Sequence, residues 1–292
     1  MSRLASDRGV VTRFAPSPTG WLHRGHAFSA LTGWTLAQET GGRFLVRIED
    51  IDVTRCRPLF EAGIFEDLAW LGLDWERPVL RQSQRMDLYR AALARLDARG
   101  LLYRCFRTRA ELLAGMASAP HGPATQGAVE RPGPAPPAEE ARRLAAGEPF
   151  AWRLDATKAI AALGGPQILA FEERGAGPDG ETGQIAPDPD LLGDVVLARK
   201  DLGVSYHLAV TVDDAAQGVT EVVRGEDLFS VTPIQRLIQA LLELPAPAYR
   251  HHRLIRGPDG ARLAKRDASQ TLRQLRAEGV TPADLRAALG FV

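Results

Sequence analysis

Cysteine, lysine and long apolar runs are scarce in this 292-residue sequence, and each scarcity excludes a class of protein. Two cysteines, Cys56 and Cys105, are too few for the disulfide framework of a small secreted domain. No apolar run reaches the ~18 residues that a membrane-spanning helix needs, and residues 1–7 lack the apolar segment of a secretory signal. We therefore expect a cytoplasmic protein with no membrane partner.

The sequence also lacks an excess of charge, with 36 basic and 36 acidic residues. A strongly basic balance indicates a nucleic-acid binder, but a local patch can serve as well, so neutrality neither supports nor excludes that function. The basic residues are 33 arginines and only three lysines, Lys158, Lys200 and Lys265. A lysine inside a motif therefore stands out. Apolar residues make up 45%, which is enough for a sizeable core.

The expected secondary structure alternates strands and helices at both ends of the chain. Segments rich in β-forming residues predict strands at residues 10–14, 44–48, 195–198, 208–212 and 221–224. Apolar residues at helical spacing predict helices that start near His26, Pro58, Met86, Thr232 and Thr281. Thr232 and Gln235 form a capping-box pattern, and residues 115–137, dense in proline and glycine, predict an irregular loop. This order predicts an α/β fold whose parallel sheet is split by an insertion.

The first motif is the run Arg13-Phe-Ala-Pro-Ser-Pro-Thr-Gly-Trp-Leu-His23-Arg-Gly25-His26, between an expected strand and an expected helix. A helix N-terminus attracts anions through its free N–H groups and its dipole. His23 and His26 lie three residues apart on one face there, and both can donate to phosphate oxygens. Gly25 leaves room for a base or ribose to touch the backbone. Taken alone, the two histidines also fit an ordinary surface turn.

Two further motifs place polar residues at the ends of expected strands, where ligands bind in open α/β sheets. The carboxylates of residues 49–52 can hold an ammonium group or a metal, or can form a solvated acidic turn. The other motif begins with Ser205-Tyr206-His207 and ends with Arg224, at the end of the strand expected at residues 221–224. A planar guanidinium suits bidentate capture of a carboxylate, although Arg224 can instead pair with Glu226 or Asp227.

The fourth motif is Arg262-Leu-Ala-Lys265-Arg266, which follows an expected turn at Asp259-Gly260. A compact ammonium on a flexible stem, such as that of Lys265, suits a triphosphate whose charge moves during a reaction. A basic surface hairpin is the alternative.

Together these motifs resemble those of class I aminoacyl-tRNA synthetases, and the run before His23 is similar to the glutamyl/glutaminyl subclass. The resemblance identifies a HIGH-like motif at Pro16, His23, Gly25 and His26. It identifies a KMSKS-like motif at Arg262, Leu263, Ala264, Lys265 and Arg266. In the latter motif, arginine replaces the first lysine and alanine replaces the serine. The implied fold is a Rossmann-like catalytic core, and the implied catalytic residues are His23, His26 and Lys265.

The same resemblance implies which residues contact each substrate. Contacts to glutamate are expected from Arg13, Ala15, Ser17, Glu49, Tyr206 and Arg224. Glu49 is expected at the ammonium group, and two arginines would suit the two carboxylates. Contacts to ATP, which arrives with Mg²⁺, are expected from Arg13, Phe14, Ala15, Pro16, Ser17, His23, Gly25, His26 and Lys265.

A zinc ion is not expected, and no residue of this chain is assigned as a metal ligand. Short members of the family often carry Cys-x-Cys with further ligands around zinc. Here Cys105 remains, Arg107 stands at the second position, and His121 adds at most one ligand where structural zinc needs four. Cys56 is expected to be a buried or half-buried small residue rather than a nucleophile.

The chain looks like the truncated glutamyl-queuosine tRNA(Asp) synthetase subfamily, because it ends at Val292, soon after the KMSKS-like motif, and because residues 47–57 and 203–208 resemble that subfamily. That resemblance implies tRNA-independent activation of L-glutamate to glutamyl-adenylate, and then transfer of glutamate to the queuosine base of tRNA(Asp). A monomer without an anticodon-binding domain is expected.

The expected domain division has four parts. They are the first half of the catalytic domain, an inserted acceptor-binding-type subdomain, the second half of the catalytic domain, and the KMSKS-like loop with a helical C-terminal segment, at residues 1–102, 103–190, 191–250 and 251–292.

Three alternatives remain open. A shortened synthetase of the same class would charge the 3′ end of tRNA(Glu). A nucleotidyltransferase would use the same phosphate site for a small molecule, with no role for Arg13, Glu49 and Arg224 in binding glutamate. A non-catalytic relic would bind RNA or a partner, and only the replacements at Arg262 and Ala264 favour it.

Overall fold

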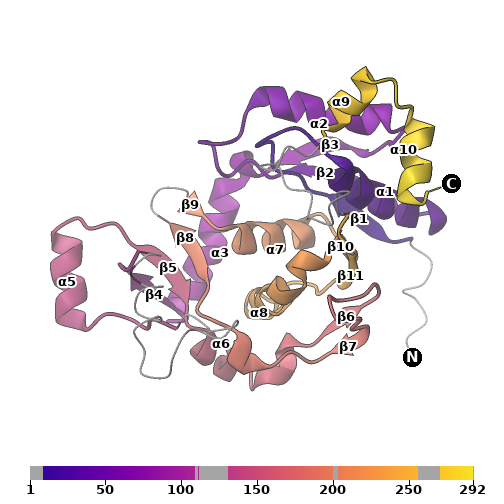
Figure 1. The fold of residues 1–292 in the computed structure, drawn as a ribbon. Helices are drawn as coiled ribbons and strands as arrows, with labels where there is room; N and C mark the ends of the chain where they lie inside the picture. Colours follow the sequence, from indigo (N-terminus) through magenta and orange to yellow (C-terminus); the bar gives the residue numbers. More distant parts are fainter. Residues whose placement is uncertain (1–8, 109–110, 112–130, 200–202, 256–269, 292) are drawn as a thin grey trace.

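The computed structural model describes residues 9–108, 111, 131–199, 203–255 and 270–291 (Figure 1). The expected turn at 259–260, the KMSKS-like residues 262–266 and most of the expected loop 115–137 lie outside the described residues. Among the helices that are described, none is both long enough and apolar enough to cross a membrane.

Parallel strands organise the N-terminal half of the molecule. β2 (Arg43–Ile48) pairs in parallel with β1 (Val11–Phe14) on one side and with β3 (Glu76–Arg81) on the other. The crossover helices are α1 (Arg24–Glu39) and α2 (Pro58–Trp70), as expected from the apolar spacing and from Pro58. Their buried faces form a shared core with β2, which includes Leu31, Val46 and Leu68.

A second sheet, built from strands of the C-terminal half, lies beside the first. β10 (Glu221–Gly225) pairs in parallel with β11 (Ala248–His252). β10 lies beside β1, where the N–H of Thr220 donates to the carbonyl of Val11 at 3.0 Å. These pairings confirm the expected α/β fold with a parallel sheet.

A further strand joins this sheet from within the middle of the chain. β6 (Phe171–Glu173) pairs in parallel with β11, and β7 (Gly183–Ile185) pairs with β6 in antiparallel fashion. Both strands fall inside residues 103–190, which were assigned to the insertion. The four-part division stays a prediction, and we propose that residues 171–185 be moved from the insertion to the catalytic sheet.

The insertion has its own antiparallel sheet, which extends to the left in Figure 1. Its strands in spatial order are β4 (Leu102–Cys105), β5 (Ala151–Leu154), β8 (Val196–Arg199) and β9 (Gly203–Val204). Strands β8 and β9 fall in residues 191–250, which were assigned to the second half of the catalytic domain, and they pair with the insertion instead. The neighbouring helices are α3 (Met86–Ala98), α5 (Pro137–Ala145) and α6 (Ala156–Ala162). Short 3₁₀ helices within the described residues are η1 (Gln82–Arg85), η2 (Pro166–Leu169), η3 (Pro189–Leu191) and η4 (Glu226–Val231).

The strand predicted at residues 208–212 is wrong, because this segment belongs to helix α7 (Tyr206–Ala216). The side chain of Ser205 caps the helix by accepting the N–H of Leu208 at 3.4 Å. Residues 208–214 are all buried, so the apolar residues 208–210 and 212 follow one another without the spaced pattern of an amphipathic helix. A short buried helix and a buried strand cannot be separated by periodicity alone.

The capping-box prediction for α8 (Thr232–Leu241) is also wrong. Thr232 is the first helical residue, and the N-cap is Val231, which makes no side-chain cap. The oxygens of Thr232 and Gln235 instead accept hydrogen bonds from Arg224. Thr232 and Gln235 are therefore acceptors for the buried Arg224, and they do not cap the helix.

Two helices close the described chain, α9 (Leu272–Ala277) and α10 (Pro282–Leu289), drawn in yellow in Figure 1. As expected, Thr281 caps α10, and Pro282 occupies the first turn. Both helices contribute buried leucines to the core of α1 and α2.

Candidate active site

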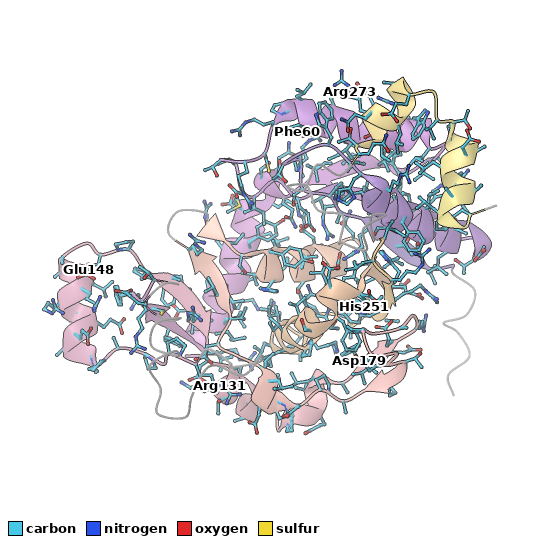
Figure 2. All side chains as sticks on the ribbon, viewed as in Figure 1. Phe60, Arg131, Glu148, Asp179, His251 and Arg273 are labelled. Carbon is cyan, nitrogen blue, oxygen red and sulfur yellow. The ribbon has the colours of Figure 1, made fainter. Side chains whose placement is uncertain are left out.

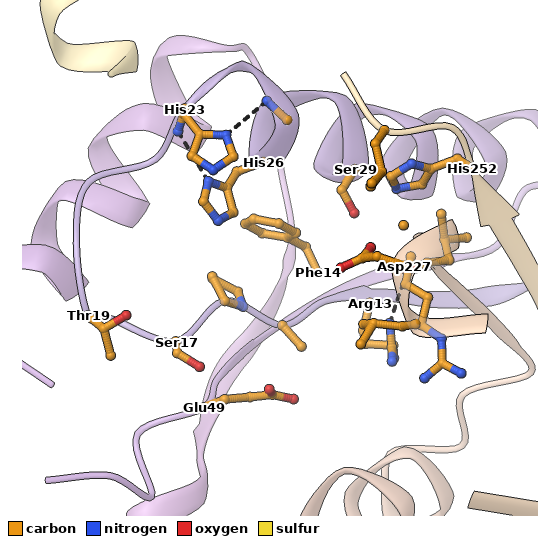
Figure 3. A pocket seen from close by; sticks show the side chains of 18 of the residues that line it. Arg13, Phe14, Ser17, Thr19, His23, His26, Ser29, Glu49, Asp227 and His252 are labelled. Carbon is orange, nitrogen blue, oxygen red and sulfur yellow. Dashed lines mark hydrogen bonds between the residues drawn. The ribbon is translucent and has the colours of Figure 1, made fainter. Parts of the chain in front are cut away.

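A cavity of about 530 Å³ lies at the carboxyl ends of β1, β2, β10 and β11 and beside the N-terminus of α1 (Figure 3). Its lining includes every expected substrate residue inside the described ranges: Arg13, Phe14, Ala15, Pro16, Ser17, His23, Gly25, His26, Glu49, Tyr206 and Arg224. Lys265, with the rest of the KMSKS-like motif, lies outside those ranges. The fold thus gathers the first three motifs into one space, which we call the active-site cavity.

The two histidines of the first motif cap the N-terminus of α1 with their own rings. Nδ1 of His23 accepts the N–H of Gly25 at 3.1 Å, and Nδ1 of His26 accepts the N–H of His23 at 3.2 Å. The ring centres lie 3.8 Å apart. Because a neutral imidazole has one donor and one acceptor nitrogen, acceptance at Nδ1 places the ring proton of each histidine on Nε2. The backbone therefore fixes both Nε2 atoms as hydrogen-bond donors.

Gly25 has a role that its expected contact to a base or ribose did not include. A Cβ at this position would lie 3.0 Å from Cε1 and 3.1 Å from Nδ1 of His23. A side chain at residue 25 would therefore force the His23 ring to shift by a few tenths of an ångström, and glycine lets the ring fold back over the helix end without that shift. Glycine thus permits the cap that selects the tautomer.

A buried ion-pair network supports the floor of the cavity. Asp214 on α7 accepts from Nε of Arg13 at 2.9 Å, from Nη2 of Arg13 at 3.3 Å and from Nη1 of Arg47 at 2.6 Å. Nη2 of Arg47 donates in turn to Glu49 at 3.1 Å. Nη1 of Arg13 donates to the carbonyl of Val223 at 3.2 Å, which ties β1 to β10. The two carboxylates balance the two guanidinium groups.

Burial and charge act in opposite directions on these groups. For Glu49, burial outweighs the attraction of Arg47 and Arg13 and raises the pKa of the carboxyl. For Asp214, burial is outweighed by Arg13 and Arg47, which lower the pKa. Asp214 is thus the firmly ionised member of the network, and Glu49, at the cavity wall, gains from a further positive group. An ammonium group is the cation that the proposed substrate offers there.

Arg224 enters the cavity wall from β10 in a different setting. Its Nη1 donates to Oε1 of Gln235 at 2.7 Å, its Nη2 to Oγ1 of Thr232 at 2.7 Å, and its Nε to Nε2 of His251 at 3.0 Å. The guanidinium carbon lies 5.1 Å from the ring centre of Tyr249. The alternative pairing with Glu226 or Asp227 is not found.

The partners of Arg224 orient its positive charge without neutralising it. They are a hydroxyl, an amide and an imidazole, and within the described part of the chain no carboxylate forms an ion pair with this guanidinium. Tyr206, at the N-terminus of α7, lines the same cavity, and burial raises the pKa of its hydroxyl. A buried, uncompensated cation beside a neutral phenol is a site for an anionic group.

Several residues that shape the site were not found from the sequence. Asp214 and its neighbour Asp213 stand at the end of the apolar run that follows His207, but neither was assigned a role from the sequence. His251 and Glu173 align Arg224 from strands that carried no motif. The cavity lining that was not expected comprises Thr19, Ser29, Arg55, Cys56, Val223, Gly225, Asp227, Leu228, His252, Arg253, Leu254 and Ile255, whereas Asp52 belongs to the expected carboxylates of residues 49–52. The adjacent histidines 251 and 252, at the end of a strand, were the one available signal.

The described residues hold no group of three or more His, Cys, Asp or Glu side chains placed to bind a metal ion. Cys105 lies buried on β4 and is not oxidised to a disulfide. His121 lies outside the described ranges. Cys56 is half-buried and lines the cavity. The expectation of a chain without zinc stays a prediction.

Comparison with known proteins places this geometry in a family. Residues 9–291 match the family model described as tRNA synthetases class I (E and Q), catalytic domain. The glutamyl-Q tRNA(Asp) synthetase of Rhodobacter capsulatus is 49% identical over 97% of this chain and 100% of its own length. The protein of the same name from Symbiobacterium thermophilum is 46% identical over 92% of this chain and 82% of its own length.

Solved structures agree with the match. A glutamate tRNA ligase from Elizabethkingia meningosepticum, crystallised in complex with its amino acid, aligns with a TM-score of 0.69 and 28% identity. The alignment covers 88% of this chain and 52% of that one, so this chain spans about half the length of the solved enzyme. The family match over nearly the whole length and the high identity to relatives of similar length lead to one conclusion: this chain belongs to the class I tRNA synthetases of the E and Q type, among the glutamyl-Q tRNA(Asp) synthetases.

Proposed function

We propose that this chain activates L-glutamate with ATP to glutamyl-adenylate, without help from RNA, and transfers the glutamyl group to the queuosine base of tRNA(Asp). The observation that supports this most strongly is a pairing within one cavity. At one wall lies a buried arginine that forms no ion pair with a carboxylate of the described residues, and two imidazoles held as donors lie at the N-terminus of α1. The first suits an acidic amino acid, and the second suits the phosphates of ATP.

The glutamate would be held by groups of matching charge. Arg224 and Tyr206 would meet a substrate carboxylate, and Glu49, whose pKa burial raises, would meet the ammonium group. Arg13 uses three of its five N–H donors inside the protein, which leaves two for a second carboxylate. Because Asp214 already balances the charge of Arg13, we assign the larger electrostatic share of glutamate binding to Arg224.

Activation is an in-line displacement at phosphorus. An oxygen of the α-carboxylate of glutamate attacks the α-phosphorus of ATP, and the bond from that phosphorus to the bridging oxygen of pyrophosphate breaks. The Nε2–H groups of His23 and His26 and the ammonium of Lys265 would stabilise the charge that grows on the phosphate oxygens. No side-chain nucleophile is needed, because holding the two substrates together supplies much of the acceleration.

Magnesium is expected to enter with the triphosphate. Mg²⁺ keeps several waters and binds mainly through phosphates and one or two carboxylates, and not in an all-protein cage. The absence of a three-ligand cluster among the described residues fits this mode. When bound, the ion would neutralise charge on the phosphates.

Transfer completes the reaction. A hydroxyl of the queuosine cyclopentene-diol would attack the carbonyl carbon of glutamyl-adenylate, and AMP would leave with the electrons of the broken C–O bond. The support for this acceptor comes from the relatives, whose names specify a glutamyl-Q product on tRNA(Asp) and which match this chain over most of their length. RNA bases are generally recognised in exposed single-stranded loops, which is where this base would be met.

The test uses the purified chain in two assays. Glutamate-dependent exchange of pyrophosphate into ATP is expected without any RNA, and glutamine and aspartate should support it poorly. Labelled glutamate is then expected to appear on tRNA(Asp) that carries queuosine, and neither on tRNA(Asp) without it nor on tRNA(Glu).

An arginine pair provides matched variants for the same assays. Arg224→Gln should abolish glutamate-dependent exchange. Arg236→Gln, which removes a half-buried arginine of α8 that bonds to the carbonyl of Ala170 outside the cavity, should leave it measurable. Exchange that needs no glutamate, or labelling of tRNA(Glu) alone, would reject the proposal.

A further inference from the structure

The orientation of Arg224 depends on a residue that does not touch it. Nε of Arg224 donates to Nε2 of His251, and Nδ1 of His251 lies 2.5 Å from Oε2 of Glu173. Glu173 stands on β6, His251 on β11 and Arg224 on β10, so the chain of contacts crosses three neighbouring strands. Figure 2 labels His251 in the interior, away from the outer rim of the molecule.

The direction of these hydrogen bonds is fixed. An arginine nitrogen always donates, so Nε2 of His251 must accept. The single proton of the neutral ring is then on Nδ1, and Glu173 must accept it. Burial lowers the pKa of His251, which keeps the imidazole neutral although Glu173 acts in the opposite direction. The His251 ring therefore bridges Glu173 and Arg224. It holds the guanidinium in one orientation, and the two charged groups do not form a direct ion pair.

Glu173 is itself held in one orientation. Oε1 accepts the backbone N–H of His251 at 2.9 Å and that of Gly175 at 2.8 Å, which leaves Oε2 for the imidazole. Its side chain and that of His251 have no exposed surface. Burial opposes ionisation of Glu173, but the bonds from His251 and Gly175 outweigh it and lower the pKa.

This arrangement makes a glutamine at position 173 more disruptive than its size suggests. Because two backbone N–H groups need an acceptor at the Oε1 position, the amide oxygen of a glutamine would take that place, and its NH₂ group would face Nδ1 of His251. Either two donors then meet, or the ring proton moves to Nε2 and opposes the N–H of Arg224. In both cases Arg224 loses its alignment.

We propose that Glu173, acting through His251, is a positioning residue that aims Arg224 at the acidic side chain of the substrate. The inference rests on the proposed function, since it concerns the glutamate site. It also gives a reason why β6 leaves the insertion and joins the catalytic sheet: the strand delivers the carboxylate that aligns the specificity arginine. Glu173 orients the guanidinium of Arg224 through the intervening His251. The positive charge of Arg224 is therefore not neutralised and can attract the ligand.

The same sheet contains a matched control, Glu221 on β10. Its side chain is also almost fully buried, but its oxygens accept from Arg174 at 2.9 Å and from Arg250 at 2.5 Å, neither of which lines the cavity. Glu221→Gln removes one buried carboxylate from the same sheet without reaching Arg224. A general cost of losing such a carboxylate would affect both variants alike.

The test measures steady-state pyrophosphate exchange for wild type, Glu173→Gln and Glu221→Gln. We expect the KM for glutamate to rise about 10- to 100-fold in Glu173→Gln, since a hydrogen bond to a charged group is misaligned, with the KM for ATP within about three-fold of wild type. Glu221→Gln should leave both KM values near wild type even if it melts at a lower temperature. An unchanged KM for glutamate in a folded Glu173→Gln overturns the inference, and so does an equal rise in Glu221→Gln.

A second pair of variants keeps the test decisive if Glu173→Gln folds poorly. His251→Gln can present an amide oxygen near the Nε2 position and so hold Arg224 without Glu173. We expect its KM for glutamate to lie below that of His251→Leu, and Glu173→Gln should add no further change in the His251→Leu background. Additive effects would overturn the relay. Absence of glutamate-dependent exchange in wild type would instead refute the proposed function, so the two failures are distinguishable.

Discussion

Replacement of Gly25 by alanine should separate catalysis from stability more cleanly than any change to the histidines themselves. The new Cβ would lie 3.0 Å from the His23 ring, which must move and release the N–H of residue 25. Loss of an N-cap costs about 0.5–2 kcal/mol of stability, and alanine returns up to about 1 kcal/mol through its higher helix propensity. The free energy of unfolding should therefore change by only about 1 kcal/mol or less.

The effect on activity should be larger. Without the cap, the ring proton of His23 is no longer confined to Nε2, and the donor that faces the phosphates loses its fixed place. A misplaced donor to a developing charge costs about 2–4 kcal/mol, so the kcat of pyrophosphate exchange should fall roughly 30- to 1000-fold. The KM for glutamate should change little, because the glutamate site that we propose is built around Arg224 and not around His23.

Gly33 offers the control within the same helix. A Cβ there would lie 3.4 Å from the Phe44 ring, which is ordinary contact. Gly33→Ala should keep both stability and exchange activity. If Gly25→Ala kept a kcat within about two-fold of wild type, the proposed link between the cap, the imidazole tautomer and catalysis would be refuted.

Three further predictions concern charge. Asp214→Asn should lower the free energy of unfolding by about 3–5 kcal/mol in urea titrations, because two buried arginines lose their shared partner, whereas the exposed Asp87→Asn should have no measurable effect. Burial raises the pKa of Asp67 from 3.8 to about 6, although an arginine on α9 attracts its carboxylate. Ionisation of this carboxyl therefore lowers the free energy of unfolding, increasingly so as the pH rises from about 4 to 6. Asp67→Asn should accordingly stabilise by roughly 3 kcal/mol at pH 8 and not at pH 3, and a loss of stability at both pH values would contradict this sign. Lys265→Ala should lower exchange about 100-fold without a change in melting temperature, while Lys158→Ala, whose ammonium bonds to a carbonyl outside the cavity, should be neutral.

The residues that line the cavity could largely be predicted from the sequence because they occupy contiguous motifs. All the expected contacts from Arg13 to His26 line one cavity, since a strand, a loop and a helix start follow each other along the chain. Glu49 and Arg224 joined them because the carboxyl ends of parallel strands meet at one edge of a sheet.

The residues that orient the side chains of the cavity could not be predicted, because each comes from a different part of the chain. Asp214 lies about 200 positions from Arg13, and it is buried in a helix that was mistaken for a strand. Thr232 and Gln235 show how local patterns mislead: they match a helix cap, yet tertiary contacts with Arg224 determine their role. Side-chain partners are set by packing, which a linear pattern does not encode.

The return of β6 to the catalytic sheet limits how this enzyme can be shortened or recombined. Looping out residues 103–190 as a cassette would remove two strands of the sheet, β6 and β7, together with Glu173. A miniature version must instead keep Phe171–Glu173 and join it on both sides by new connections. Chimeras with relatives face the same restriction, because a crossover point between β6 and β11 would combine the carboxylate of one parent with the histidine of the other.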